Sequence, residues 1–489
     1  MNVMRFLILS ENSREYYLHH HYRNMAANEL RRRVLLAGHE ALLIEWIRHW
    51  DKNDLRKIID NYFENQPEPV IALSSTFDIV NSDLYYLEDI FAYAKEKFPA
   101  VKIIHGGNRV YIKENFSKYV DVEFIGRSMG MFDDWLYKRD ITKYIARTDP
   151  LVLVNNDVDR NIDNPIIHSL YDDDFLNSHD HLGFEMGVGC KFNCSFCDYP
   201  LRNAKNVKIN TPEKLKKLFS ESYEKYGITN YYAIDDTLND DDLKLEYLWE
   251  AIKDLPYKPQ ITAWIRLDLL HKPRQKELFK LINFSAVWFG IESFNPNVSK
   301  SIRKKSHMTN VYKLLEFVRD ECPDTYVTGS FIIGLPGDNY ESIARGFEKA
   351  ANEKLLNSLA VYCYSLTNYD ADVKDIYMVS DMERNPEKFG FKIYNKSQHF
   401  ENYYNQIFWE SDWINSKDAF ALTRKLNDMY QDKFFLLQHS EVASFKSMKL
   451  IKSKDDSKNV TALKSKGLVL ANLFKKNYIA KKKKDLGIA

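Results

Sequence analysis

Three of the five cysteines in this 489-residue chain lie within eight residues of one another, at Cys190, Cys194 and Cys197. Three thiolates on one short loop can ligate three irons of a [4Fe–4S] cluster and leave the fourth iron open, whereas a closed cluster normally takes four cysteines. Zinc also accepts thiolates, but structural zinc sites usually pair two Cys-x2-Cys knuckles, and the sequence contains no second one. The spacing therefore predicts an iron–sulfur cluster, and we expect Cys322 and Cys363 to be ordinary buried thiols.

The loop resembles the Cys-x3-Cys-x-aromatic-Cys signature of the radical S-adenosylmethionine (SAM) enzymes, with Phe196 at the aromatic position. In that family the open iron chelates the amino and carboxylate groups of SAM. An electron from the cluster then cleaves SAM to a 5′-deoxyadenosyl radical, which abstracts hydrogen from the substrate. The resemblance implies a [4Fe–4S] cluster and SAM as cofactors, Phe196 near the adenine, and an electron donor such as flavodoxin or ferredoxin.

Four later segments occur in the order that this resemblance implies. The acidic pair Asp235 and Asp236 follows a predicted strand and would bind the SAM amino group, and Arg266 would bind the SAM carboxylate. Glu292, in Gly-Ile-Glu-Ser, is a candidate polar contact to SAM, and the turn at 334–337 is the family's Gly-Leu-Pro-Gly. The alternatives are a helix cap or solvated turn for the acidic pair, a surface ion pair for Arg266, and a carboxylate at the core edge for Glu292.

The first third of the chain alternates short apolar runs with helical patterns, which predicts a doubly wound parallel α/β sheet over residues 1–145. Such a domain before a radical SAM barrel resembles the cobalamin-binding subfamily. Ser74, Thr76, Gly106 and Gly107 fall where that domain's loops meet the corrin. The Asp-x-His-x-x-Gly motif, which supplies an axial histidine in many cobalamin proteins, is absent, and the loop after the first predicted strand is bulky. Two interpretations therefore remain: a domain that binds cobalamin, or a scaffold that has kept the fold without binding it.

Residues 146–180 are polar and acidic, which predicts a linker. Six further strand patterns, most of them followed by helical stretches, predict a partial (β/α)6 radical SAM barrel over 181–380. The predicted strands are 182–186, 231–234, 261–265, 286–289, 326–333 and 359–364. Residues 381–489 are expected to form a mainly helical region with a lysine-rich tail.

The tail gives the chain a strong charge asymmetry. Residues 441–489 contain 13 lysines and four acids, a balance of +9, although the whole chain has a formal net charge of zero. We expect a solvated tail that is able to contact an anionic partner. No apolar run reaches the ~18 residues of a membrane span, and the N-terminal apolar stretch is too short for a signal peptide, so we expect a cytoplasmic protein.

Taken together, these features predict a radical SAM enzyme that would transfer a methyl group if cobalamin binds. The alternatives are a radical SAM rearrangement, cyclisation or oxidation enzyme without cobalamin, or a catalytically silent metal-binding scaffold. A zinc-stabilised nucleic-acid-binding protein, suggested by the basic tail, is a third possibility that iron analysis would exclude.

Overall fold

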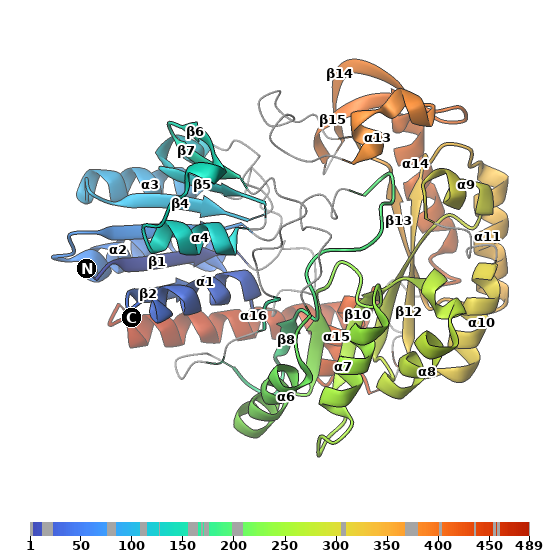
Figure 1. Ribbon diagram of the computed structural model, residues 1–489, viewed down its shortest axis with the longest axis horizontal. Coiled ribbons are helices and arrows are strands. Elements are labelled where there is room, and N and C mark those ends of the chain that lie inside the picture. The colour runs from blue at the N-terminus through green and yellow to red at the C-terminus, as the bar shows by residue number, and fades with distance from the viewer. Residues whose placement is uncertain are drawn as a thin grey trace.

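A computed structural model describes residues 3–488 except 12–22, 76–84, 108–114, 127, 155–164, 168–169, 171–175, 198–208, 305–309, 367–379, 401–402, 435–436, 453–455 and 457–459. Two parallel sheets stand side by side, and the long helix α16 (Val460–Asp485) extends from one to the other (Figure 1). No helix in the described part of the chain combines the length and the apolar content that crossing a membrane requires.

The N-terminal sheet has seven strands in the order β2-β1-β3-β4-β5-β7-β6. All neighbours are parallel except β6 and β7. The elements, in chain order, are β1 (Arg5–Ser10), α1 (Met25–Leu36), β2 (Glu40–Ile44), α2 (Lys52–Phe63), β3 (Pro69–Ser74), α3 (Tyr85–Lys97), β4 (Lys102–Gly106), β5 (Val122–Ile125), α4 (Met129–Leu136), β6 (Ile145–Thr148) and β7 (Leu151–Val154).

Both faces of this sheet are covered, as its nearly continuous apolar strands require. Side chains of a strand alternate between faces, so Phe6 and Ile8 of β1 pack in the cluster that also contains residues of α1 and α4. Leu7 and Leu9 point the other way, into the cluster formed with α2 and α3. The predicted doubly wound sheet is confirmed.

The predicted linker does not hold for its first residues. Strands β6 and β7 occupy 145–154 and extend the N-terminal sheet past the expected boundary at 145. The apolar run Leu151-Val-Leu-Val is mostly buried against β5, and the acidic residues that follow it in the sequence hide this signal.

The second sheet has six parallel strands in the order β13-β12-β11-β10-β9-β8 and stays open, because β8 and β13 are its two edges. This is the predicted partial barrel. Its elements are β8 (His181–Phe184), α6 (Pro212–Tyr226), β9 (Asn230–Ala233), α7 (Asp242–Ile252), β10 (Gln260–Ile265), α8 (Pro273–Ile282), β11 (Ala286–Glu292), α9 (Pro296–Ser301), α10 (Val311–Glu321), β12 (Tyr326–Ile333), α11 (Tyr340–Asn352) and β13 (Ser358–Cys363).

The C-terminal region is less purely helical than predicted. It begins with the short helix α13 (Asp381–Arg384) and a two-stranded antiparallel hairpin, β14 (Lys392–Phe400) and β15 (Tyr403–Glu410). Helices α14 (Ser416–Tyr430) and α15 (His439–Ser447) follow, and α15 packs against Ala286 and Tyr326 of the second sheet. Trp409 of this region belongs to the core, since it is buried against Tyr364 and Phe391.

The lysine-rich tail is also ordered, as helix α16, and is not a flexible extension. Near its C-terminal end Tyr478 is fully buried against Trp46 of the N-terminal sheet domain, with ring centroids 4.9 Å apart. The Tyr478 hydroxyl accepts a hydrogen bond from the Glu45 amide and donates to the Leu43 carbonyl, at 3.3 and 3.4 Å. The helix is therefore fixed to the domain that begins the chain.

Candidate functional site

The three predicted ligand cysteines lie on the loop after β8, at the carboxyl edge of the second sheet, where open α/β folds place their ligands. We call residues 187–197 the Cys loop. Cys190 and Cys194 are each 8% exposed, and Cys197 is partly exposed. The Ser195 amide donates to the Ile302 carbonyl and the Cys197 amide to the Cys194 carbonyl, so neighbouring segments hold the loop.

Asp235, which follows β9, binds the backbone at the start of the Cys loop. Its carboxylate accepts hydrogen bonds from the Met186 and Gly187 amides, at 2.7 and 2.8 Å, and it is 1% exposed. Burial raises the pKa of Asp235 to about 6, while Lys244 and the backbone donors oppose that rise. The structure thus gives Asp235 a loop-holding position, and the neighbouring Asp236 is the partly exposed member of the predicted acidic pair.

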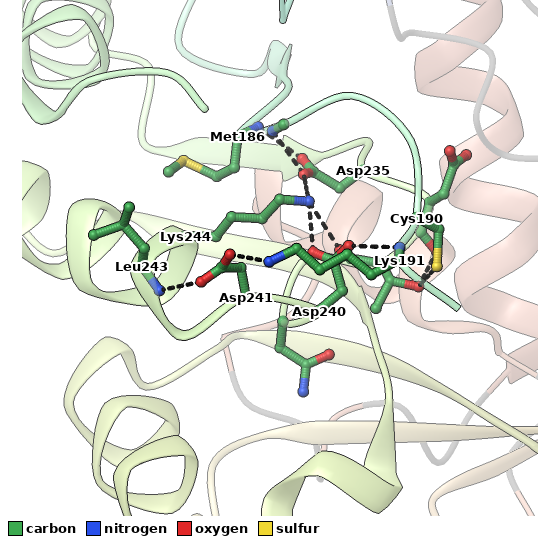
Figure 2. A network of polar contacts seen from close by, with 12 residues as sticks. Met186, Cys190, Lys191, Asp235, Asp240, Asp241, Leu243 and Lys244 are labelled. Carbon is green, nitrogen blue, oxygen red and sulfur yellow. Dashed lines mark hydrogen bonds and ion pairs between the residues drawn. The ribbon is translucent and has the colours of Figure 1, made fainter. Parts of the chain in front are cut away.

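A fully buried lysine completes this arrangement. Lys244, from the first turns of α7, has no exposed surface, and its Nζ lies 3.1 Å from Asp235 and 2.8 Å from Asp240. Asp240 in turn accepts a hydrogen bond from the Lys191 amide inside the Cys loop. Figure 2 shows the Lys244 side chain reaching between the two carboxylates, which connect it to both ends of the Met186–Lys191 segment.

The sequence analysis did not identify Lys244, Asp240 or Thr237. Thr237 lies 3.6 Å from the sulfur of Cys190, and its carbonyl accepts from Lys244. The available signal was a lysine at helical spacing from Asp240 among the apolar residues Leu245 and Leu248. Such a lysine is expected to point inward only when a carboxylate meets it.

Arg266, just after β10, lies beside the sulfur of Cys194. Its Nη1 donates to the sulfur of Cys194 at 3.3 Å, while Asp268 binds Nε and Nη2 in a two-pronged pair at 3.0 and 2.8 Å. The ring of Phe192, from the Cys loop, stacks on the guanidinium with 3.7 Å between the ring centroid and the central carbon. Arg266 is 6% exposed, which excludes the surface ion pair considered as its alternative.

Glu292 lies at the end of β11 with a left-handed backbone, φ 65°, and forms a buried ion pair with Lys304. Gly290 makes room for that pair, since a Cβ there would lie 2.7 Å from both the Glu292 carboxylate and the Lys304 Nζ. Lys304 also lies 6.0 Å from the centroid of Phe196, the aromatic residue of the signature. The structure thus brings Glu292 and Phe196 together through Lys304.

The Gly-Leu-Pro-Gly turn serves packing in this structure. A Cβ on Gly334, where φ is +102°, would lie 2.4 Å from Cη2 of Trp409. Trp413 donates from its indole nitrogen to the Leu335 carbonyl at 2.9 Å. The turn therefore anchors the segment that follows the β14–β15 hairpin. Cys322 is buried and Cys363 partly buried; burial raises the pKa of both, as expected of ordinary thiols.

The donors fit an iron–sulfur cluster. The three thiols share one loop, and Arg266 gives one sulfur a charged hydrogen-bond donor, an arrangement suited to a thiolate. Within the described ranges, no group of three or more His, Cys, Asp or Glu side chains is close enough to share one metal ion. In a [4Fe–4S] cluster each thiolate ligates its own iron, so the three sulfurs need not converge on one ion.

The N-terminal sheet has a different feature at its own carboxyl edge. A cavity of about 70 Å³ opens between α1 and α4 over the ends of β3 and β4. Three of the four residues predicted to meet a corrin line it, namely Ser74, Gly106 and Gly107, and the fourth, Thr76, lies outside the described residues.

Comparison with known proteins gives a family match within the second sheet and fold matches to solved structures. Residues 184–350 match the family model of the Radical SAM superfamily. The match runs from the end of β8 into α11. Curated relatives include hopanoid C-2 methylase of Rhodopseudomonas palustris, 28% identical over 160 residues, which are 32% of this chain and 30% of the relative. Another is the ribosomal protein uS12 methylthiotransferase RimO of Paramagnetospirillum magneticum, 21% identical over 198 residues, 37% of this chain and 44% of the relative.

The chain thus spans less than half the length of these two relatives. Its fold, however, matches solved structures over nearly the whole of this chain. TsrM from Kitasatospora setae, a radical SAM methyltransferase, superposes with a TM-score of 0.67 at 11% identity, covering 99% of this chain and 100% of TsrM. The cobalamin-dependent radical SAM enzyme OxsB, with aqua-cobalamin bound, gives 0.61 at 11% identity, covering 96% of this chain and 72% of OxsB. The shared fold includes both sheets of this chain.

Proposed function

We propose that this protein is a cobalamin-dependent radical SAM methyltransferase. The proposal rests on one observation: each of the two sheets of this chain has a candidate cofactor site at its carboxyl edge. The Cys loop lies at the carboxyl edge of the second sheet, and the cavity lined by Ser74, Gly106 and Gly107 lies at that of the first. The fold match over nearly the whole chain to TsrM, solved with cobalamin and a [4Fe–4S] cluster, and to OxsB, solved with aqua-cobalamin, supports the same reading.

Cys190, Cys194 and Cys197 would hold the cluster, whose bound form supplies the electron for reductive cleavage of SAM. The chain's own contribution is to hold the ligands in place and keep water away. Asp235 and Lys244 fix the loop backbone, and the low exposure of Cys190 and Cys194 limits solvent access. An electron donor such as flavodoxin or ferredoxin is the expected partner.

The first sheet would hold cobalamin, which carries methyl groups. Its cavity is lined by small and apolar side chains such as Ala26, Ala72 and Phe124, and glycines at 106 and 107 let the backbone approach a ligand. Ser10 and Glu11, which begin the bulky first loop, are buried and contact Asn24 and Arg48, so these two charged or polar side chains turn inward. The bulky first loop was an argument against cobalamin binding, and the inward position of these two side chains weakens it.

Methylthiotransfer, the activity in the name of RimO, is the second candidate because of sequence similarity. A second cluster would require further cysteines. Outside the Cys loop the sequence has Cys322 and Cys363, both in the barrel and neither in the N-terminal domain. Methyl transfer is therefore the better-supported reaction.

The test is cobalamin retention by the anaerobically purified, iron-reconstituted full chain. Ala26, half-buried on α1, lines the cavity, so Ala26→Phe should fill it and weaken cobalamin binding at least tenfold. Leu36→Phe, at an exposed position of the same helix, is the matched control and should bind like the wild type.

One result would count against cobalamin-dependent methyl transfer, and another against the cavity as its binding site. A wild-type chain with a full complement of iron but no affinity for cobalamin would favour rearrangement, cyclisation or oxidation chemistry. Equal cobalamin affinity in Ala26→Phe and Leu36→Phe would show that the cavity is not part of the cobalamin-binding site.

A further inference from the structure

Arg266 is placed to act on the cluster itself. The family resemblance implies a SAM carboxylate as its partner, yet its guanidinium already has two buried partners in this structure. Asp268 occupies the edge formed by Nε and Nη2, and Nη1 points at the sulfur of Cys194. Because the guanidinium is planar and rigid, the pair with Asp268 also fixes the direction of Nη1, which points at the sulfur of Cys194.

The surroundings leave this group little freedom to move. Asn239, fully buried, accepts from the Arg266 amide at 2.8 Å and donates to the Arg266 carbonyl at 3.0 Å, which fixes the backbone. Phe192 covers one face of the guanidinium, and Asp268 is 2% exposed. Asn239 thus holds the backbone of Arg266, and Asp268 and Phe192 hold its guanidinium, so the side chain is preorganised for the contact with Cys194.

We propose that Arg266 sets the reduction potential of the iron–sulfur cluster through its charged hydrogen bond to Cys194, with Asp268 as the positioning residue that aims it. This inference rests on the proposed function, because it requires a cluster on the Cys loop. Hydrogen bonds to cluster sulfurs and local charge both set such potentials. Reduction adds negative charge to the cluster and its thiolates, so a donor cation at Cys194 favours the reduced state and raises the potential.

The experiment is a redox titration of the reconstituted full chain without SAM, followed by electron paramagnetic resonance of the reduced cluster. Arg266→Gln removes the charge, and Asp268→Asn leaves the arginine but loosens its aim. We expect Arg266→Gln to lower the equilibrium constant for reduction at least tenfold, which is 59 mV for a one-electron couple. Asp268→Asn removes a negative charge and leaves the Arg266 cation without its counter-ion, so its potential should shift in the opposite direction and by less.

Arg274→Gln is the matched control, because Arg274 pairs with Glu246 and Glu277 on the surface of α8 and should leave the potential unchanged. If Arg266→Gln fails to retain iron, the shift in Asp268→Asn decides the question. Potentials of Arg266→Gln and Asp268→Asn equal to that of the control would overturn the proposal.

Titration of SAM binding separates this role from the one that the family resemblance implies. A residue that anchors the SAM carboxylate would, when replaced, weaken SAM binding and leave the SAM-free potential as it was, and that pattern would also overturn the proposal. Absence of iron from the wild-type chain would contradict the proposed function and this inference together. A wild-type cluster with an unshifted potential in the variants would contradict this inference alone.

Discussion

The carboxyl edges of the two sheets are built in opposite ways. At the second sheet the Cys loop lies on a dense layer of buried charge, in which Lys244 and Asp235 have essentially no exposed side-chain surface. At the first sheet the strands β3 and β4 end in small residues, among them Ala72, Gly106 and Gly107, and a cavity of about 70 Å³ remains. One edge holds the backbone firmly, and the other leaves space.

The difference follows from what each edge would bind. Thiolate ligands must meet irons at fixed positions, so the loop that carries them needs support from residues behind it. A cofactor as large as cobalamin exceeds about 70 Å³, so this cavity would receive only one part of it, where small residues let the backbone approach. The buried charges of the second sheet thus stabilise a loop, and no charge of that kind lines the described cavity of the first.

Lys244→Met is the change expected to have the largest effect on this contrast. It leaves Asp235 and Asp240 buried without their cation, and breaking a buried pair in this way costs about 3–5 kcal/mol. We expect a lower midpoint of thermal unfolding and loss of most of the iron after reconstitution. Thermal scans and iron analysis measure both.

Lys253→Met is the control for that change, because Lys253 lies at the end of the same helix and pairs with Glu250 at the surface. It should retain wild-type iron content and stability. Full iron retention by Lys244→Met would mean that the buried charges do not hold the Cys loop.

A pH dependence is expected at the first sheet, through His105. This side chain on β4 is 1% exposed, its Nε2 lies 2.8 Å from the Ser75 hydroxyl, and burial lowers its pKa from 6.5 to about 4. The unfolded chain then takes up a proton near pH 6.5 that the folded chain refuses, so stability falls as pH drops from 6.5 towards 4. The loss attributable to His105 is about 3 kcal/mol over that range.

The measurement is the difference in unfolding free energy between wild type and His105→Gln, taken at several pH values. The variant has no group to titrate at this position, so the difference should change by that amount between pH 7 and pH 4. A difference that does not vary with pH would show that His105 is not held in its neutral form.

The smallest effect is expected where α16 meets the first sheet. Tyr478→Phe removes the hydroxyl that bonds the Glu45 amide and the Leu43 carbonyl while keeping the ring against Trp46. Loss of these hydrogen bonds should cost about 1 kcal/mol. Hydrogen exchange at the Glu45 amide reports the change locally, and unaltered protection there would contradict the contact.

Much of the fold was predictable because its signals are local. Each strand of the two sheets carries a short β-rich run. The spacing of the three cysteines alone predicts an iron–sulfur cluster. The strand 151–154 was missed because the polar residues around it matched a linker. The tail was misread because its lysines dominate the composition, while Phe474 and Tyr478, four residues apart, mark the face that packs.

The supporting residues of the site could not be predicted because their roles depend on contacts far apart in the sequence. Asp235 is separated from the Met186 amide by 49 residues, and Arg266 from Cys194 by 72. The sequence supplied Asp235 and Arg266 as candidates, but not the partners that turn one into a loop support and bring the other to a ligand sulfur. Only the folded sheet brings these groups together.

The most direct test of the account is the cofactor content of the full chain after anaerobic reconstitution with iron and sulfide in the presence of cobalamin. We predict about four irons per chain and one cobalamin, with Cys194→Ala losing the iron and keeping the cobalamin because the two sites lie on different sheets. One zinc per chain without iron, or loss of both cofactors in Cys194→Ala, would contradict two separately built sites.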